Sequence, residues 1–514
     1  AVLLAIAIIL GAVGLGGWWW LQRQSPLQLE GQRLETPLTA RFLPRTANVS
    51  VVLEMDPGLL PAYGRAVAPA RQRSAAAEQL SHLRDGLFLA AGLDYSTELA
   101  DWLGEESSLS LRAGKEGGAP ASWVMALTSR SDSGGRQFLQ RFWQSRSLAG
   151  GDLEISRYRG LGVISSRGQQ PQGRPSTASP AASHPPLATA LVNDQLVLLA
   201  SSRSALEEAL DASQEDALNL GADPLLTDWL EQQPHGVALL RGDATGISQL
   251  MGLPAELRPG EPIQAWVGSL ELQRRGLQLD AQAVTDHAGH EQGLSSRDQA
   301  LLDQLNLPLE RLSLSQPGAP LPALFELQAE PDDPLLAQLQ ASRDAAMLQG
   351  RLSDGSGWLA GSPAAHPAAS ALDAALAAEG FDAANLDELK VWSHLTGKSD
   401  RQGQLQAQVA GASGGDGELR WWSNNLTVLR QQLQHRGASK GPAARLRAIE
   451  PEAGTQALLG LDANGSSTLL SSWALWRGLQ LMAGRPLTPA IEGMELALSE
   501  DQNITSLHAT LHVH

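Results

Sequence analysis

"ALLGLDANG" at residues 457–465 nearly repeats "ALLRGDATG" at residues 238–246, and both fit the pattern A-L-L-x-x-D-A-x-G. In each copy an apolar, strand-like run ends at an aspartate, and small residues follow it. Asp243 and Asp462 therefore stand where a side chain accepts a hydrogen bond from the first turn of a helix. We interpret the phrase as a strand-to-helix corner in a duplicated α+β unit. We prefer a helix-capping role for its aspartate to a catalytic role.

Related phrases place further corners along the chain. "LPRTANVSVVLEMDP" from Leu43 and "QPGAPLPALFELQAEPDDP" from Gln316 each end in Asp-Pro, which suits an N-cap followed by proline at the first helical position. Two short hairpins, turning at Asn193-Asp194 and Asp354-Gly355, each precede a helix that ends in A-L-D-A. We expect these two hairpin-helix segments to be equivalent.

A longer hairpin is expected three times, and its second strand alternates apolar and polar residues, as a sheet with one packed face does. Those strands begin at Leu277, Leu405 and Leu507. The stretch at 165–186 is rich in Pro, Ser, Gly and Gln, so it is predicted to be a disordered loop.

The first residues predict a membrane anchor. Residues 1–24 have no charged residue before Arg23 and are mostly apolar, and Trp18, Trp19 and Trp20 lie where an interfacial aromatic belt belongs. The predicted fold class is therefore α+β: an N-terminal transmembrane helix, then a duplicated ectodomain of antiparallel sheets with packed helices. We expect a polar tether at 25–39, a first half at 40–288 and a second half at 289–514.

Charge and composition exclude some classes of function. The chain has 514 residues and a net charge of −17, which argues against nucleic acid as a partner, because that requires clustered Lys and Arg. It has no Cys, so disulfides, thiol nucleophiles and Cys-based metal sites are excluded.

Motifs that suggest catalysis or metal binding fit poorly. Ser413 lies in "GASGG", but a nucleophile elbow needs a helix after the serine, and this one is followed by a second strand. "TGKS" at 396–399 lacks the glycine that a phosphate loop places five residues earlier. His287 and His290 lack the spacing and the glutamate of a zinc helix.

The histidines and tryptophans near the C-terminus are further candidates. His508, His512 and His514 share one strand face, where we prefer polar filler to a metal site because glutamines hold the matching places in the sister hairpins. Four tryptophans are core candidates or, alternatively, a partner surface, and one of the two adjacent ones is expected to be exposed. They are Trp421, Trp422, Trp473 and Trp476.

Three stretches resemble a known family: "ARFLPRTANVSVVLEMDP", "LADWLGEESSLSL" and "ALVNDQLVLLAS". With the N-terminal anchor, they resemble a family of uncharacterised cyanobacterial proteins, domain of unknown function 3352. The resemblance covers most of 38–290 and, more loosely, the rest. It implies a single-pass protein of the inner or thylakoid membrane, with its bulk in the periplasm or lumen, and it supplies no catalytic residues.

The leading hypothesis is a non-enzymatic scaffold, assembly or binding protein with a protein partner and without a cofactor. The alternative is a carrier or binder of a hydrophobic ligand, and a hydrolase comes third, because no base and nucleophile were found together.

Overall fold

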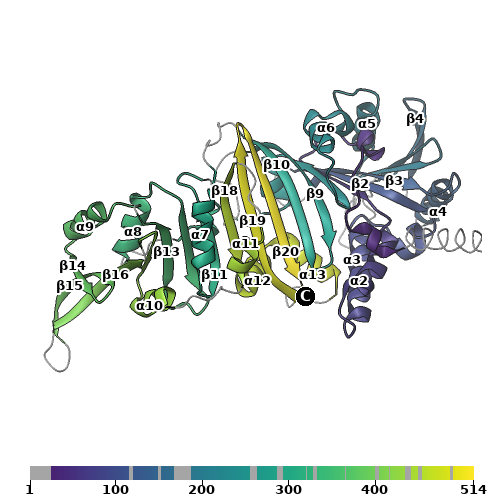
Figure 1. The fold of residues 1–514 in the computed structure, drawn as a ribbon. Helices are drawn as coiled ribbons and strands as arrows, with labels where there is room; N and C mark the ends of the chain where they lie inside the picture. The colour runs from purple at the N-terminus through teal and green to yellow at the C-terminus, as the bar shows by residue number, and fades with distance from the viewer. Residues whose placement is uncertain are drawn as a thin grey trace, which may run out of the picture.

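The computed structural model describes residues 25–114, 120–148, 152–166, 187–254, 263–285, 293–319, 321–327, 333–364, 366–399, 405–415, 417–434, 441–449, 454–484, 486 and 490–513. Within them, all strands belong to one antiparallel sheet (Figure 1). The strands are β1 (Val49–Glu54), β2 (Leu103–Ala113), β3 (Pro120–Ser129), β4 (Leu153–Tyr158), β5 (Leu161–Ser166), β6 (Ala188–Val192), β7 (Leu196–Ala200), β8 (Ala238–Gly242), β9 (Ile263–Gln273), β10 (Gly276–Thr285), β11 (Leu309–Ser315), β12 (Met347–Leu352), β13 (Trp358–Pro363), β14 (Asp382–Leu386), β15 (Leu389–Ser399), β16 (Leu405–Gly415), β17 (Leu419–Ser423), β18 (Thr455–Leu461), β19 (Ile491–Asp501) and β20 (Ile504–Val513).

This single sheet corrects the predicted fold class, which was an N-terminal transmembrane helix followed by a duplicated ectodomain of antiparallel sheets with packed helices. Among the described residues, no helix has both the length and the apolar character needed to cross a membrane. The predicted anchor at 1–24, with Trp18, Trp19 and Trp20, lies outside those residues, so the transmembrane part of the prediction has no support. The fold is one large antiparallel sheet with helices on both faces.

The order of strands reads the same from either end. It runs β4-β5-β6-β7-β3-β2-β1-β8-β9-β10 through the first half and continues β20-β19-β18-β11-β12-β13-β17-β16-β15-β14 through the second. Each first-half strand thus has an equivalent in the second half, and β10 pairs with its own equivalent, β20.

The pairing register of equivalent strands also matches between the two halves. Val49 lies opposite Gly242 and Leu53 opposite Ala238, just as Arg311 lies opposite Leu461 and Ser315 opposite Ala457. The two A-L-L phrases are therefore the same strand, β8 and β18, in two copies of one unit.

A local two-fold axis relates the halves. At the joint Asp280 pairs with His508, and each is the fifth residue of its strand, so the axis passes between equivalent positions.

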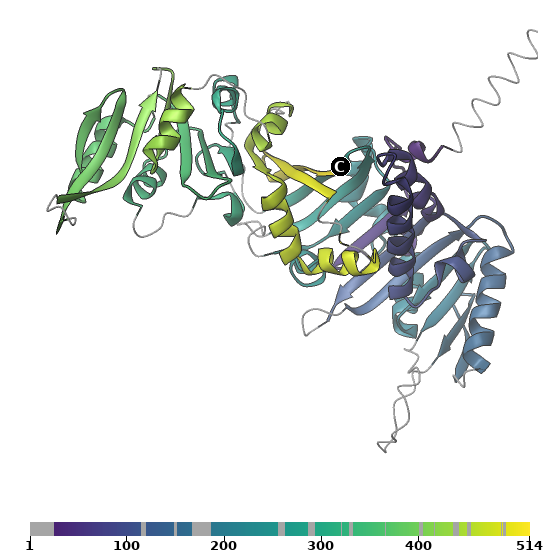
Figure 2. The ribbon, with the colours of Figure 1, turned by 90° about the horizontal axis from the view of Figure 1, so that it is seen from below.

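Helices cover both faces of the sheet (Figures 1 and 2). We call one side the α6–α11 face and the other the α12–α13 face. The helices are α2 (Leu60–Val67), α3 (Arg73–Ala90), α4 (Gly134–Leu148), α5 (Arg203–Ala212), α6 (Pro224–Glu231), α7 (Ser296–Gln304), α8 (Pro334–Ala341), α9 (Ala369–Ala378), α10 (Leu426–Gln434), α11 (Pro442–Arg447), α12 (Ala463–Ser472) and α13 (Ala474–Met482).

Burial on both faces explains the two adjacent tryptophans of β17. Trp421 packs with Leu312 and Leu348 on the α6–α11 face, whereas Trp422 packs with Trp358 and Leu336 on the opposite face. Their exposed fractions are 2% and 1%. The prediction that one of the two is exposed is therefore wrong, because an inner strand covered on both faces buries successive side chains.

Local signals for turns and caps are confirmed. Asp243 and Asp462 each accept a hydrogen bond at 2.8 Å, from the amides of Gly246 and Gly465 respectively. Asp333 likewise accepts from the amide of Leu336 at 3.1 Å. The cap interpretation of the repeated phrase is correct because capping depends on a few neighbouring residues.

Two other sequence expectations are wrong. The stretch from Gln316 contains no strand in its described residues, since β11 has already ended at Ser315. A short 3-10 helix, Ala323–Phe325, follows its prolines, which have no backbone N–H to donate a hydrogen bond to a neighbouring strand. The hairpin-helix β6-β7-α5 is equivalent to β16-β17-α10 and not to β12-β13-α9, because the strand order decides equivalence.

Residues 25–39, expected as a polar tether, lie against the first half. Leu29 and Leu34 are each 2% exposed. The amide of Leu34 donates to the carbonyl of Pro234 at 3.0 Å, and the amide of Gly236 donates to that of Gln32 at 2.7 Å. This segment therefore belongs to the folded unit.

A second contact joins the halves on the α12–α13 face. Helix α13 packs on α3, where Gly86 lies so close to Met482 that an added Cβ at Gly86 would be 2.7 Å from that side chain. The indole of Trp473 donates to the carbonyl of Met251 at 2.7 Å. The joint is thus made both by strand pairing and by helix packing.

Candidate binding groove between the two halves

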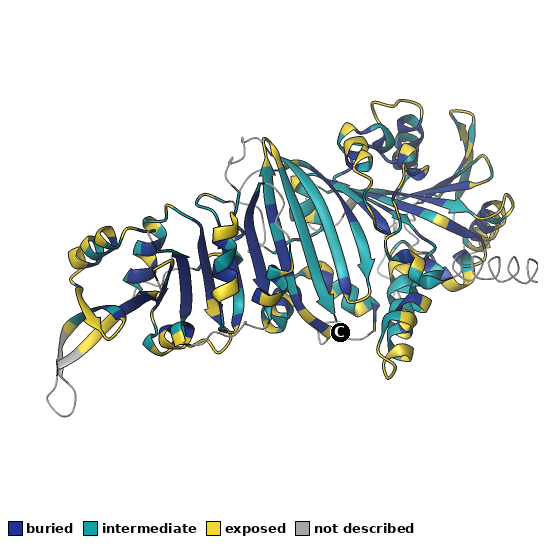
Figure 3. Cartoon of the chain, viewed as in Figure 1, coloured by how far each residue is buried: buried dark blue, intermediate teal, exposed yellow. Residues whose placement is uncertain are grey.

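The four central strands, β9, β10, β20 and β19, carry the first candidate site. No helix lies in front of them in Figure 1, and Figure 3 shows most of their residues as half-buried. A cavity of about 480 Å³, the central groove, opens here on the α6–α11 face. Residues of both halves line it: Trp229, Gln232, Asp280, Ala281, Gln282, Ala448, Ile449, Thr455, Ala497, Ser499, Ser506, Leu507 and His508.

Strand alternation makes the floor of the central groove polar. On this face Asp280 and Gln282 of β10 lie opposite His508 and Ser506 of β20. On the other face most of the paired side chains are apolar, as with Leu277 and Leu511, because successive side chains point to opposite sides. The central strands therefore turn their polar side toward the open groove.

A contact between a histidine and an aspartate lies on the two-fold axis. His508 Nδ1 lies 2.5 Å from Asp280 Oδ1, and both side chains remain partly exposed. A second histidine of the same strand, His512, pairs with Glu495, a carboxylate that is 2% exposed and also binds Arg445. His508 and His512 thus each have a carboxylate partner in the described structure, and His514 lies outside it.

The walls come from equivalent helices. Trp229 of α6 is mostly buried at one side, and Ile449, just after α11, lines the other. The side chains of Gln232 and Gln282 lie 3.4 Å apart and close one edge. The groove thus combines a charged centre, hydroxyls and amides with two apolar walls, an arrangement suited to a polar ligand or polypeptide segment.

The other predicted residues are dispersed. Ser413 lies inside β16 and is 2% exposed, and the T-G-K-S stretch lies at the end of β15. His287 and His290 lie outside the described residues. Trp476 is buried beside Ile491, and Trp473 is half-buried between the halves. The four tryptophans therefore form no common exposed surface.

Sequence reasoning missed Asp280 as a partner of His508. A signal was present, because Leu279-Asp280-Ala281 and Leu507-His508-Ala509 are matching triplets, each counted from the start of its strand. Only the pairing of β10 with β20, however, brings the two equivalent positions together.

A comparison with known protein families identifies the family of this chain. Residues 3–310 match a family described as "Protein of unknown function (DUF3352)". That range is more than half of the chain, so the chain belongs to this family. A comparison with curated proteins gave no match.

A solved structure, "Structure of crystal form I of TP0453", is 10% identical, with a TM-score of 0.29. The likeness covers 52% of this chain and 84% of that chain. At that score it carries no argument about fold or function.

Proposed function

We propose that the protein is a non-catalytic scaffold or binding protein, and that its two halves together hold a partner in the central groove. The observation that supports this most is the position of the groove, on the two-fold axis and lined by both halves. Binding sites occur preferentially at such junctions between structural units. Because both halves share one sheet, the groove is largely preformed.

The polar floor disfavours the alternative of a hydrophobic-ligand carrier at this site. Burying an apolar ligand against Asp280, His508 and the neighbouring hydroxyls would desolvate these groups without replacing their hydrogen bonds. A partner with its own polar groups, such as an extended polypeptide segment, would satisfy them.

A hydrolase is the second candidate, since the groove holds the Asp280–His508 pair together with the hydroxyls of Ser499 and Ser506. Both serines lie in inner strands, whose backbone amides are paired within the sheet. The floor therefore offers no pair of free amides to stabilise an oxyanion, although such stabilisation usually contributes most to the catalysis of acyl transfer. A fluorophosphonate probe tests this: we expect no labelling, and labelling lost in Ser506→Ala would favour the hydrolase.

Affinity purification of the full chain, followed by mass spectrometry, tests the binding function. Ser506→Trp fills the groove from its floor, and Ser74→Trp places the same side chain on an exposed part of α3 as a control. We expect partners shared by the wild type and Ser74→Trp to be absent from Ser506→Trp. An identical partner set for all three proteins would contradict a role for the groove.

The cyanobacterial source and the extracytoplasmic location that the resemblance implies stay predictions. So does the presence of a protein partner.

A further inference from the structure

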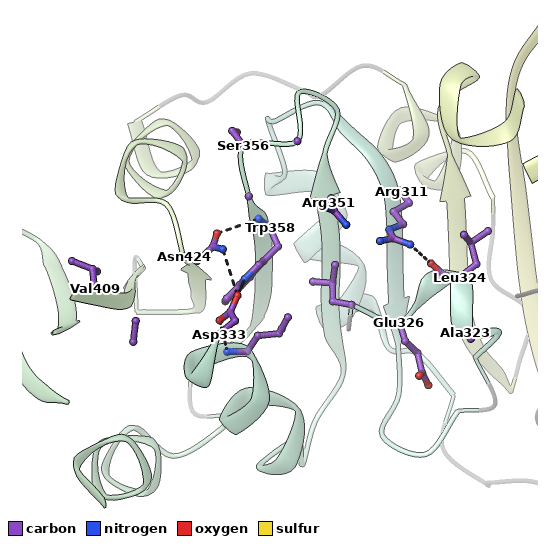
Figure 4. Close-up of a pocket in the computed structure, with 15 residues that line it drawn as sticks. Arg311, Ala323, Leu324, Glu326, Asp333, Arg351, Ser356, Trp358, Val409 and Asn424 are labelled. Carbon is purple, nitrogen blue, oxygen red and sulfur yellow. Dashed lines mark hydrogen bonds between the residues drawn. The ribbon is translucent and has the colours of Figure 1, made fainter. Parts of the chain in front are cut away.

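A second cavity, of about 620 Å³, lies in the second half on the α12–α13 face (Figure 4). Strands β11, β12 and β13 form its floor, and the segment 323–327, the start of α8 and the β12–β13 turn surround it. Its volume is within the range of small-molecule sites. We call it the arginine pocket because Arg311 and Arg351 line it.

The two arginines are held side by side. Arg311 of β11 pairs directly with Arg351 of β12, so their side chains leave the same face of the sheet as neighbours. Figure 4 shows the two arginines on neighbouring strands, where both line the pocket; Arg311 is half-buried and Arg351 is exposed. Among the described residues, neither makes a salt bridge. Two like charges thus stand together without a salt-bridged carboxylate, and the charge of the adjacent Glu310 acts on Arg311 less strongly than that of Arg351.

The surroundings of Arg311 make its charge costly. One terminal nitrogen donates to the carbonyl of Leu324 at 2.8 Å, whereas the buried Nε has no hydrogen-bond partner. Burial, and next the charge of Arg351, lower the pKa of Arg311 below its ordinary value. A buried donor without a partner and a repelling neighbour would both be relieved by an anion.

The duplicated fold does not require these charges. By register, Arg311 takes the place of Val49 in the first half, and Arg351 takes the place of Leu111. The residue opposite this second position is a tryptophan in both halves, Trp123 and Trp358. The same sheet therefore forms with aliphatic residues at both sites, so the arginines point to a function of the second half.

Acidic residues in the wall do not neutralise the pair. Asp333 caps α8 through the amide of Leu336 and also accepts from the indole nitrogen of Trp358, so its carboxylate is engaged in structure. Glu326 points away from both guanidinium groups in Figure 4. The rest of the lining combines apolar side chains, such as Leu324 and Leu336, with the polar Ser356 and Asn424.

We propose that the arginine pocket binds a small molecule that carries a carboxylate or phosphate group, with Arg311 and Arg351 holding its anionic oxygens. A guanidinium presents N–H donors in a planar fork that matches either group. Leu324, Leu336 and Trp358 contact the body of the ligand. This site is separate from the central groove, on the other face of the sheet, and does not depend on the function proposed for that groove.

Isothermal titration calorimetry on the full chain, at one ionic strength set with NaCl, tests the proposal. The probes are phenyl phosphate and phenylacetate, which share a ring, with inorganic phosphate and acetate as the anionic groups alone. The variants Arg311→Val and Arg351→Leu install the first-half residues. Arg297→Leu removes an exposed arginine of α7 and controls for the loss of one charge.

We expect saturable binding of at least one ring-bearing anion to the wild type and to Arg297→Leu. Each pocket variant should raise the Kd at least ten-fold, since a hydrogen bond to a charged group contributes that much or more. A response to only one head group identifies it as the ligand chemistry.

Ligand-free thermal unfolding is the second readout. Arg351→Leu should unfold at a temperature no lower than the wild type, since it removes a like-charge pair. If Arg311→Val does not fold, Arg351→Met takes its place as the second pocket variant in the binding measurement. The proposal is overturned if neither ring-bearing anion binds the wild type saturably, or if both pocket variants bind as the wild type does.

Discussion

Replacing Asp243 by alanine should cost more stability than replacing Asp462, although the two aspartates cap equivalent corners. Loss of an N-cap costs about 0.5–2 kcal/mol. Asp243 Oδ2 also accepts from Asn48 Nδ2 at 2.8 Å, whereas Asp462 Oδ2 has a Ser353 hydroxyl at 3.3 Å in an exposed setting. A charged hydrogen bond adds roughly 1.5 kcal/mol at the lower end of its range. We therefore expect about 2–3.5 kcal/mol for Asp243→Ala and about 0.5–2 kcal/mol for Asp462→Ala.

Urea unfolding of the full chain, followed by far-UV circular dichroism, measures these costs. Asp243→Asn and Asp462→Asn are matched controls, because asparagine keeps the capping oxygen. At 243 the new NH2 group cannot accept from Asn48 Nδ2, so Asp243→Asn should keep the cap and lose only that second hydrogen bond. The double alanine variant should equal the sum of the singles within roughly 0.5 kcal/mol, since the corners share no partner. If the halves unfold in separate transitions, each variant is assigned to its own. Equal costs for both alanine variants, or costs that the asparagine variants reproduce, would refute the reasoning.

Further perturbations test other parts of the fold. Burial raises the pKa of Glu54 to about 7, so the folded state binds the proton more tightly than the unfolded state does. The stability of the fold therefore falls as the pH rises from about 4.5 to 7. Glu54→Gln should raise the melting temperature at pH 8 and change it little at pH 4. Replacing 167–186 by Asn-Gly should leave the melting temperature nearly unchanged, because Ser166 and Leu187 are hydrogen-bonded to each other at 2.8 Å and a two-residue turn can join them; a large drop would show that the deleted residues pack. Gly86→Val should lower the melting temperature through a clash with Met482, whereas Gly478→Ala, where nothing lies within 4 Å, should raise it by the usual helix preference for alanine; equal effects would contradict tight packing of α3 on α13.

Local chemistry was predictable from the residues alone. Asp243 and Asp462 cap helices, and Asn193 and Asp194 form the β6–β7 turn with positive φ angles of 49° and 59°. These features depend on a few consecutive residues, so the pattern already contains their physical cause. The duplication was likewise predictable, because the equivalent strands β8 and β18 have similar sequences.

The candidate sites were less predictable because they depend on pairs distant in the chain. Asp280 meets His508 only because β10 pairs with β20, and neither residue is unusual in its own strand. Arg311 and Arg351 look like ordinary solvent-facing residues until the register places them side by side over a cavity. Their equivalence to Val49 and Leu111 follows from the strand order alone, since the sequences around these positions differ.

What the sequence by itself determined is therefore the repeated α+β unit, its capped corners and its hairpin turns, which follow from short-range hydrogen bonding and strand alternation. Only the tertiary structure decided that the two units share one sheet, that both faces of β17 are covered so that Trp421 and Trp422 are buried, and that β6-β7 corresponds to β16-β17. The physical reason is that strand alternation states which residues share a face, but not which strand lies beside them or what covers that face.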